Sequence, residues 1–128
     1  MTIYGVSVSA SDLPRARTFY ELLGFRFPEA DPGHTHLEGE DDSGVRLMID
    51  SASSLAALYG EAPRPGTAAG FAIVVPSREA VDETVDGVRS GGHTVVTDPY
   101  DAPWGHRYAR LADPDGYQVV VFCPLPAG

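Results

Sequence analysis

The chain has 128 residues, 18 acidic against 9 basic, and a formal net charge of -9. This length fits one compact domain. Every basic residue is an arginine, which excludes Schiff-base lysine chemistry and argues against a nucleic-acid partner. Cys123 stands alone, so no disulfide forms within one chain, and no apolar run is long enough to span a bilayer. We therefore expect a soluble cytoplasmic protein without a membrane partner.

The first half of the chain alternates strand and helix signals. Residues 3–9 place Val6 and Val8 at a period of two, which predicts a strand with one packed face. Asp12 and the proline after it open a helix that ends at Gly24. A short strand should follow and be broken at Pro28, and two further strands are predicted over residues 34–40 and 45–50.

The second half starts again after a linker over residues 51–69, which holds one predicted helical turn at 55–59. A strand over 70–75 leads into a helix that opens at Ser77 and ends at two glycines, 91 and 92. Three more strands are predicted: 94–97, 106–112 and 117–123. We expect residues 98–105 to form a proline-rich loop.

The second half also repeats the pattern of the first at a constant offset of 72 residues. An acidic turn ending at Gly44 matches one ending at Gly116, and each is flanked by a polar and an apolar strand. The repeat predicts an α+β fold: two βαβββ units, 1–50 and 70–123, with pseudo-twofold symmetry in a single domain. A mixed, curved sheet should then surround a cleft.

Side-chain parity assigns two faces to the predicted strands. One face should pack under the helices: Val6, Val8, Leu47, Ile49, Phe71, Ile73, Val119 and Val121. The opposite face mixes polar and aromatic side chains, as a ligand-lining surface does. From it we take these candidate ligand-binding residues: Ser7, His36, Met48, Asp50, Tyr108, Arg110, Gln118 and Phe122. Trp104, near the end of the predicted loop 98–105, is added as a flat aromatic wall.

Several motifs carry a family resemblance over essentially the whole chain. They are Ser11-Asp12-Leu13, Phe19-Tyr20, Leu23-Gly24-Phe25, Pro103-Trp104-Gly105 and Asp113-Pro114-Asp115-Gly116. Together they resemble the vicinal-oxygen-chelate superfamily, which includes glyoxalases, extradiol dioxygenases and bleomycin-resistance proteins. The resemblance implies the paired βαβββ architecture and a homodimer.

The same resemblance implies a divalent metal held by His and Glu side chains. Carried over position by position, the ligands fall at Gly5, Met48, Gly70 and Val120, and none of these offers a nitrogen or oxygen side-chain donor. The sequence is therefore more similar to the metal-free, bleomycin-resistance type of binding protein. We expect no metal and no cofactor.

Some candidate residues leave two interpretations open. Trp104 either stacks on a ligand or seals a loop, and Tyr108 and Phe122 either line the cavity or pack in the core. Arg46 and Arg110 either grip an anionic ligand or are neutralised by strand carboxylates such as Glu38 and Asp50.

The predicted function is metal-independent binding and sequestration of a small molecule, an antibiotic or aromatic metabolite. The alternative is a glyoxalase-like lyase, isomerase or dioxygenase. It would use either an irregular metal site of His34, His36 and His106, or His and Asp as acid and base.

Overall fold

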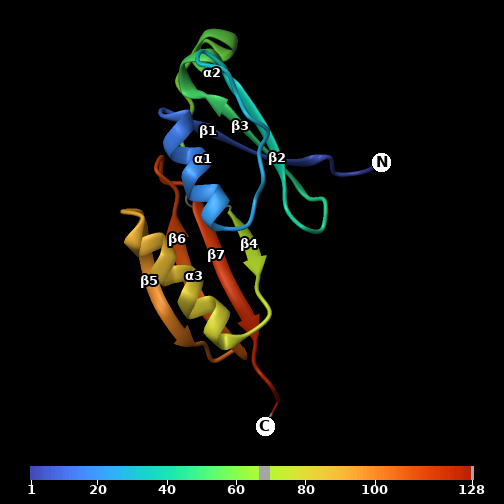
Figure 1. Ribbon diagram of the computed structural model, residues 1–128, viewed down its shortest axis with the longest axis vertical. Coiled ribbons are helices and arrows are strands. Elements are labelled where there is room, and N and C mark those ends of the chain that lie inside the picture. Colours follow the sequence, from blue (N-terminus) through green and yellow to red (C-terminus); the bar gives the residue numbers. More distant parts are fainter. Residues whose placement is uncertain (67–69, 128) are drawn as a thin grey trace. The chain divides into compact units, whose positions relative to one another are not determined.

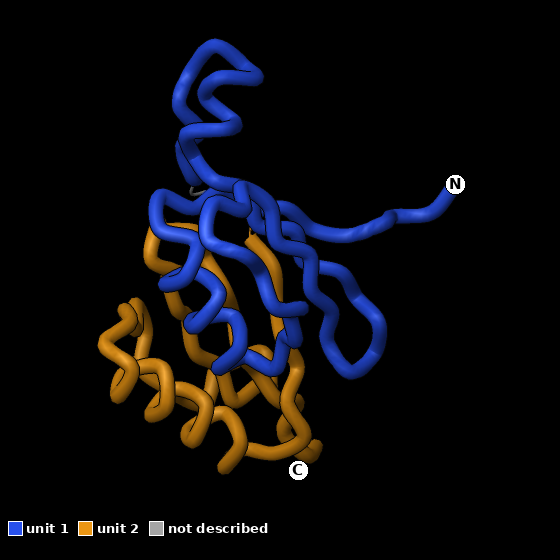
Figure 2. The backbone as a smooth tube through the Cα atoms, turned by 45° about the horizontal axis from the view of Figure 1, so that its top comes forward, with its two compact units in different colours: residues 1–65 blue, residues 66–128 orange. Residues whose placement is uncertain are grey.

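The computed structural model describes residues 1–66 and 70–127. The chain forms two compact units, Met1–Pro65 and Gly66–Gly128, which Figure 2 distinguishes by colour. Each unit is a mixed β-sheet with helices, so the predicted α+β class is confirmed. None of the described helices is long and apolar enough to cross a membrane.

Unit 1 holds three strands and two helices, drawn in blue to green in Figure 1. They are β1 (Gly5–Ala10), α1 (Leu13–Leu22), β2 (His36–Glu40), β3 (Arg46–Ser51) and α2 (Ala52–Tyr59). β3 is the central strand, parallel to β1 and antiparallel to β2. α1 begins where the Asp12 side chain accepts a hydrogen bond from the backbone N–H of Arg15, as an N-cap does.

Unit 2 holds four strands and one long helix, drawn in yellow to red in Figure 1. They are β4 (Phe71–Val74), α3 (Arg78–Ser90), β5 (Thr94–Asp101), β6 (His106–Ala112) and β7 (Gln118–Pro124). The strand order is β4-β7-β6-β5, with β4 parallel to β7 and the other pairs antiparallel. α3 packs against β5, β6 and β7, and Ser77 caps its first turn.

Each unit buries the strand face that its helix covers. In unit 1, Leu47 and Ile49 are fully buried together with Phe19 and Tyr20 of α1. In unit 2, the fully buried side chains come from both strands and helix: Val81, Val85, Val88, Ala109, Leu111, Val119 and Val121. Of the eight side chains predicted to pack, Val6, Phe71 and Ile73 are only half-buried and the other five are buried. The predicted parity of the faces is thus confirmed for β3, β4 and β7, whereas in β1 the burial does not alternate, because Val8, Ser9 and Ala10 are all buried.

The repeat is visible in the hydrogen bonds of the two hairpin turns. Asp41 Oδ1 accepts from the backbone N–H groups of Ser43 and Val45, each at 2.9 Å. Asp113 Oδ1 accepts at the same distances from the residues 72 positions later, Asp115 and Tyr117. The glycine that closes each turn has a positive φ, +86° for Gly44 and +96° for Gly116, which a side chain would strain. The two units therefore share one turn design.

Three segments differ from expectation. The strand predicted after Gly24 is reduced to one bridge between Arg26 and Glu40, because Pro28 cannot continue a ladder. The predicted linker begins with the last residue of β3 and then holds α2, two turns of helix rather than one. Residues 98–101, expected as loop, belong to β5, where Tyr100 pairs with Tyr108 across two register shifts.

Candidate functional site

We call the strand face opposite α1 the open face of unit 1. Its side chains form rows across the sheet, because register partners on adjacent strands point to the same side. One row runs from Ser7 through Met48 to Glu38, and the next pairs Asp50 with His36. Four predicted ligand-binding residues, Ser7, His36, Met48 and Asp50, are therefore neighbours on this face.

Charged side chains of this open face form a connected network. His36 Nδ1 donates to Asp50 Oδ1 at 2.6 Å, and its Nε2 lies 3.9 Å from Glu38 Oε1. Arg46 donates to Glu38 Oε2 at 3.0 Å, and the Tyr4 hydroxyl donates to the same oxygen at 2.9 Å. Arg46 also lies over the Tyr4 ring, 5.2 Å from its centroid. The hydrogen bond to Glu38 raises the pKa of Tyr4, because it stabilises the protonated phenol.

The open face of unit 2, opposite α3, is largely aromatic. Trp104 makes edge-to-face contacts with Tyr108 and Tyr100, with ring centroids 5.0 and 6.3 Å apart. Tyr108 in turn is the register partner of both Tyr100 and Phe122. Trp104 is 54% exposed, so this cluster presents an accessible aromatic surface.

Polar groups adjoin the aromatic cluster. Arg110 follows Tyr108 on the same side of β6 and donates to Gln118 Oε1 at 2.9 Å. His106 stacks on Phe122, with centroids 4.6 Å apart and planes 22° from parallel. The five remaining predicted residues, Trp104, Tyr108, Arg110, Gln118 and Phe122, thus share one face of unit 2. The predicted cleft stays a prediction.

The structure decides several alternatives that the sequence left open. Arg46 is neutralised by a strand carboxylate, Glu38, whereas Arg110 is bonded to an amide and so keeps its positive charge available. Tyr108 and Phe122 are half-buried on the open face rather than packed in the core. Trp104 is 54% exposed and packs edge-to-face on Tyr108, so its two roles, stacking on a ligand and sealing a loop, both stay predictions.

The positions that the resemblance assigns to metal ligands do not fit a divalent ion. Gly5 and Gly70 lack side chains, and a Cβ there would lie 2.7 Å from the carbonyl oxygen of Arg46 and 2.8 Å from that of Gln118. A histidine at either glycine would therefore require the strands to move apart. Met48 and Val120 offer no oxygen or nitrogen. Within residues 1–66 and 70–127, no three His, Cys, Asp or Glu side chains gather in a metal-holding group, and this includes His34, His36 and His106.

Sequence reasoning missed two side chains on these faces and one pocket. Tyr4 was outside the candidate set, although it belongs to the Glu38 network. Tyr100 was assigned to a loop, although it is part of the aromatic cluster. A pocket also lies beside β2, where the strand predicted after Gly24 is reduced to a bridge. Parity gave no usable signal for Tyr100, because register shifts in β5 let Thr97 and Tyr100, which differ in parity, both pair with residues on the open face.

Both units thus combine a mixed β-sheet with a helix on one side, and both contain the same aspartate-held hairpin turn. The sequence profile of the Glyoxalase/Bleomycin resistance protein/Dioxygenase superfamily matches residues 3–121. The chain belongs to this superfamily.

Solved structures with the same fold come from several bacteria. A hypothetical protein from S. aureus superposes with a TM-score of 0.81 at 18% identity, covering 96% of this chain and 94% of that one. A glyoxalase/bleomycin resistance protein/dioxygenase from Nocardioides gives 0.74 at 22% identity, covering 100% and 87%. A genomically encoded fosfomycin resistance protein from Listeria monocytogenes gives 0.74 at 13% identity, covering 100% and 94%. At these identities the likeness establishes the fold. None of the curated proteins matches the chain.

Proposed function

We propose that the chain binds and sequesters a small planar molecule, an antibiotic or aromatic metabolite, without a bound metal. The observation that carries the proposal is the exposed aromatic cluster of Tyr100, Trp104 and Tyr108 beside Arg110. Flat, rigid side chains next to a few placed polar groups are the usual composition of small-molecule sites.

The polar neighbours favour a ligand with an anionic or carbonyl group. Arg110 is held by Gln118, which fixes its direction while leaving its charge uncompensated. An arginine in this state donates readily to a carboxylate, phenolate or quinone oxygen. A planar conjugated acid or quinone therefore matches both the aromatic cluster and the guanidinium of Arg110.

Two further points support the proposal. The four ligand positions implied by the resemblance carry no suitable donors, and Gly5 and Gly70 are in close contact with the neighbouring strand. The family name includes bleomycin resistance beside glyoxalase and dioxygenase, which supports a drug as the bound molecule.

Trp104 provides the test, because it is the single tryptophan of the chain. Titration with planar natural-product antibiotics should quench its fluorescence and raise the unfolding temperature of the protein. The variant Trp104→Ala should bind the same compound roughly three- to tenfold more weakly, since one aromatic contact is lost.

The matched control is Tyr59→Ala, which removes an exposed aromatic ring at the end of α2 in unit 1. It should leave affinity unchanged, and treatment with a chelator should do the same. Affinity that disappears with the chelator and returns with a divalent metal would overturn the proposal. So would a panel in which no compound stabilises the protein.

The His36–Asp50 pair supports a second candidate function, metal-free acid–base catalysis. Asp50 accepts a hydrogen bond from the N–H at Nδ1 of His36. The imidazole is therefore oriented, and Nε2 is the nitrogen available to take a proton from a substrate. The His36 side chain is 49% exposed, so a substrate reaches it. This arrangement suits proton abstraction next to a carbonyl, as an isomerase requires.

Deuterium exchange from solvent into hydroxyacetone, followed by NMR, tests this candidate. The protein should accelerate the exchange, and His36→Gln should lower the rate by roughly 10²-fold or more. His34→Gln is the control, because His34 is exposed and its ring Nδ1 lies 3.1 Å from the Asp31 carbonyl oxygen rather than beside a carboxylate. Equal loss in both variants, or no acceleration by the wild-type protein, would contradict acid–base catalysis.

A further inference from the structure

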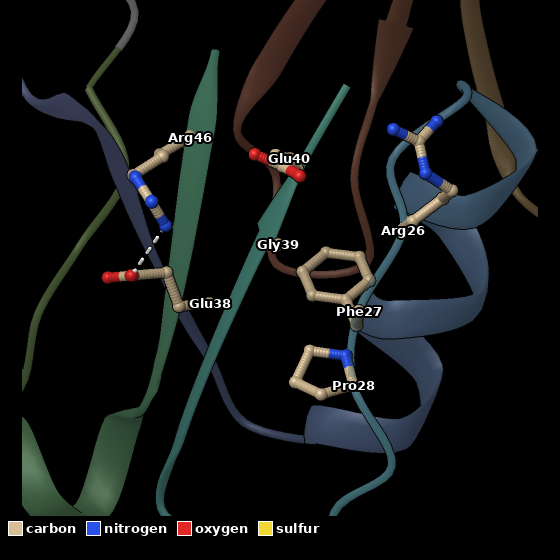
Figure 3. Close-up of a pocket in the computed structure, with 7 residues that line it drawn as sticks. All are labelled: Arg26, Phe27, Pro28, Glu38, Gly39, Glu40 and Arg46. Atoms are coloured by element: carbon tan, nitrogen blue, oxygen red, sulfur yellow. Dashed lines mark hydrogen bonds and ion pairs between the residues drawn. The ribbon is translucent and has the colours of Figure 1, made fainter. Parts of the chain in front are cut away.

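Unit 1 contains a pocket of roughly 370 Å³ at the free edge of β2. The segment Arg26–Pro28 forms one wall and the strand residues Glu38, Gly39 and Glu40 form another. Figure 3 shows Phe27 and Pro28 on one side of β2, and the Arg46–Glu38 pair on the other. Every lining residue belongs to unit 1.

The pocket exists because unit 1 lacks most of the strand that borders β6 in unit 2. At an offset of 72, Glu38 corresponds to Arg110, whose outer neighbour on β5 is Thr97. In unit 1 the corresponding pairing stops at the Arg26–Glu40 bridge. Beyond it the carbonyls of Phe27 and Pro28 turn away and accept hydrogen bonds from Arg17, at 3.1 and 3.0 Å.

The backbone of Glu38 therefore faces the pocket. Arg26 and Glu40 exchange both of their backbone hydrogen bonds, at 2.9 and 3.1 Å. In an antiparallel strand, groups two residues apart point to the same edge, so the N–H and C=O of Glu38 point toward this edge as well. The pocket thus offers one backbone donor and one backbone acceptor.

The charged side chains around the pocket are unequally compensated. Arg26 pairs with Asp42, and Arg46 pairs with Glu38, which also accepts from Tyr4. Arg46 is the register partner of Glu40, yet its guanidinium is bonded to Glu38. The carboxylate of Glu40 makes no hydrogen bond or ion pair with the described part of the chain.

From this arrangement we infer a second binding site, which takes a small organic cation. An amidinium or ammonium group donates to the Glu40 carboxylate and to the Glu38 carbonyl, and its apolar body lies against Phe27 and Pro28. The ligand chemistry is opposite in charge to that expected at Arg110, so the two sites are independent. Gly39 is required here, because a Cβ would lie 2.6 Å from both the Arg26 carbonyl oxygen and the Phe27 ring.

Benzamidine is a suitable probe, and benzamide is its neutral counterpart of nearly equal shape. In an NMR titration of the full chain, benzamidine should shift the amide signals of Arg26, Glu38 and Gly39 with a saturating dependence on concentration. Benzamide should bind at least tenfold more weakly, because it lacks the charge that Glu40 complements.

The decisive variant is Glu40→Gln, which keeps the side-chain shape and should weaken benzamidine binding about tenfold. Its control is Glu83→Gln on α3, which changes the net charge equally but should leave binding unchanged. Equal binding of the two probes, equal effects of the two variants, or signal changes confined to residues outside both Arg26–Pro28 and β2 would each overturn the inference. An unfolded Glu40→Gln protein is distinguishable by its spectrum, and the comparison of the two probes then still tests the site.

Discussion

The carboxylates of the two hairpin turns show how single residues set the local geometry. Asp41 accepts hydrogen bonds from the Ser43 hydroxyl at 2.8 Å and from two backbone N–H groups. Desolvation alone would raise the pKa of Asp41, but these hydrogen bonds to the charged form outweigh it and lower the pKa. The ionised carboxylate is therefore part of the folded turn.

This lowered pKa has a predicted pH dependence. A carboxyl group with a lower pKa in the folded state contributes stability above its unfolded pKa, and the contribution is lost as pH falls through the folded value. Asp41→Asn should therefore be less stable than wild type at pH 7, by at most about 1 kcal/mol because the turn is solvated. The difference should shrink below the ordinary pKa of 3.8.

Urea unfolding of wild type and Asp41→Asn, at neutral and at acidic pH, measures the difference in their free energies of unfolding under both conditions. Asp31→Asn, which removes an exposed loop carboxylate, is the control and should track wild type at each pH. If the penalty of Asp41→Asn stays constant between pH 7 and pH 3, the turn carboxylate does not act through its charge.

At the scale of elements, the period of apolar residues was enough to place most strands and both long helices. Val81, Val85 and Val88 lie on one helix face, and all three are fully buried in α3. The alternation in β3 and β7 likewise assigned the helix-covered side correctly. These segments were predictable because local pattern and tertiary burial agree.

The elements that were misjudged are those where proline interrupts the pattern. Pro99 suggested a loop, yet β5 is an edge strand, where a missing N–H costs no ladder bond. Pro28 has the opposite effect, since no paired strand extends from Arg26 past it. Whether a proline ends a strand depends on which edge its nitrogen faces, and the sequence does not contain that information. The pocket beside β2 was unpredictable for this reason.

At the scale of the molecule, the candidate residues could be grouped only by face. Strand parity correctly placed Tyr108 and Phe122 on one face, and Trp104 joins them from the segment between β5 and β6 by a ring contact with Tyr108. Hydrogen bonds such as His36–Asp50 depend on rotamers and cross-strand register, which periodicity does not specify. The choice of ligand depends on such hydrogen bonds, so the sequence alone indicates a class of small-molecule-binding protein and not the compound that it binds.

We also predict that the chain is a homodimer in solution, as the resemblance implies. Unit 2 exposes large apolar side chains, with Val74 of β4 at 62% and Trp104 between β5 and β6 at 54%, and such surfaces are usually covered in part by a partner. Light scattering on a sizing column should give twice the chain mass of 13.6 kDa. A particle of single-chain mass at micromolar concentration would contradict the dimer.

The matching aspartate-held turns have a consequence for how such a protein changes its preferences. Each hairpin is held in register by its own turn carboxylate and glycine, not by the side chains on its open face. Substitutions on the open face of one unit therefore leave the strand register of both units intact. The duplicated chain can acquire a new specificity on one half while the other keeps its original one.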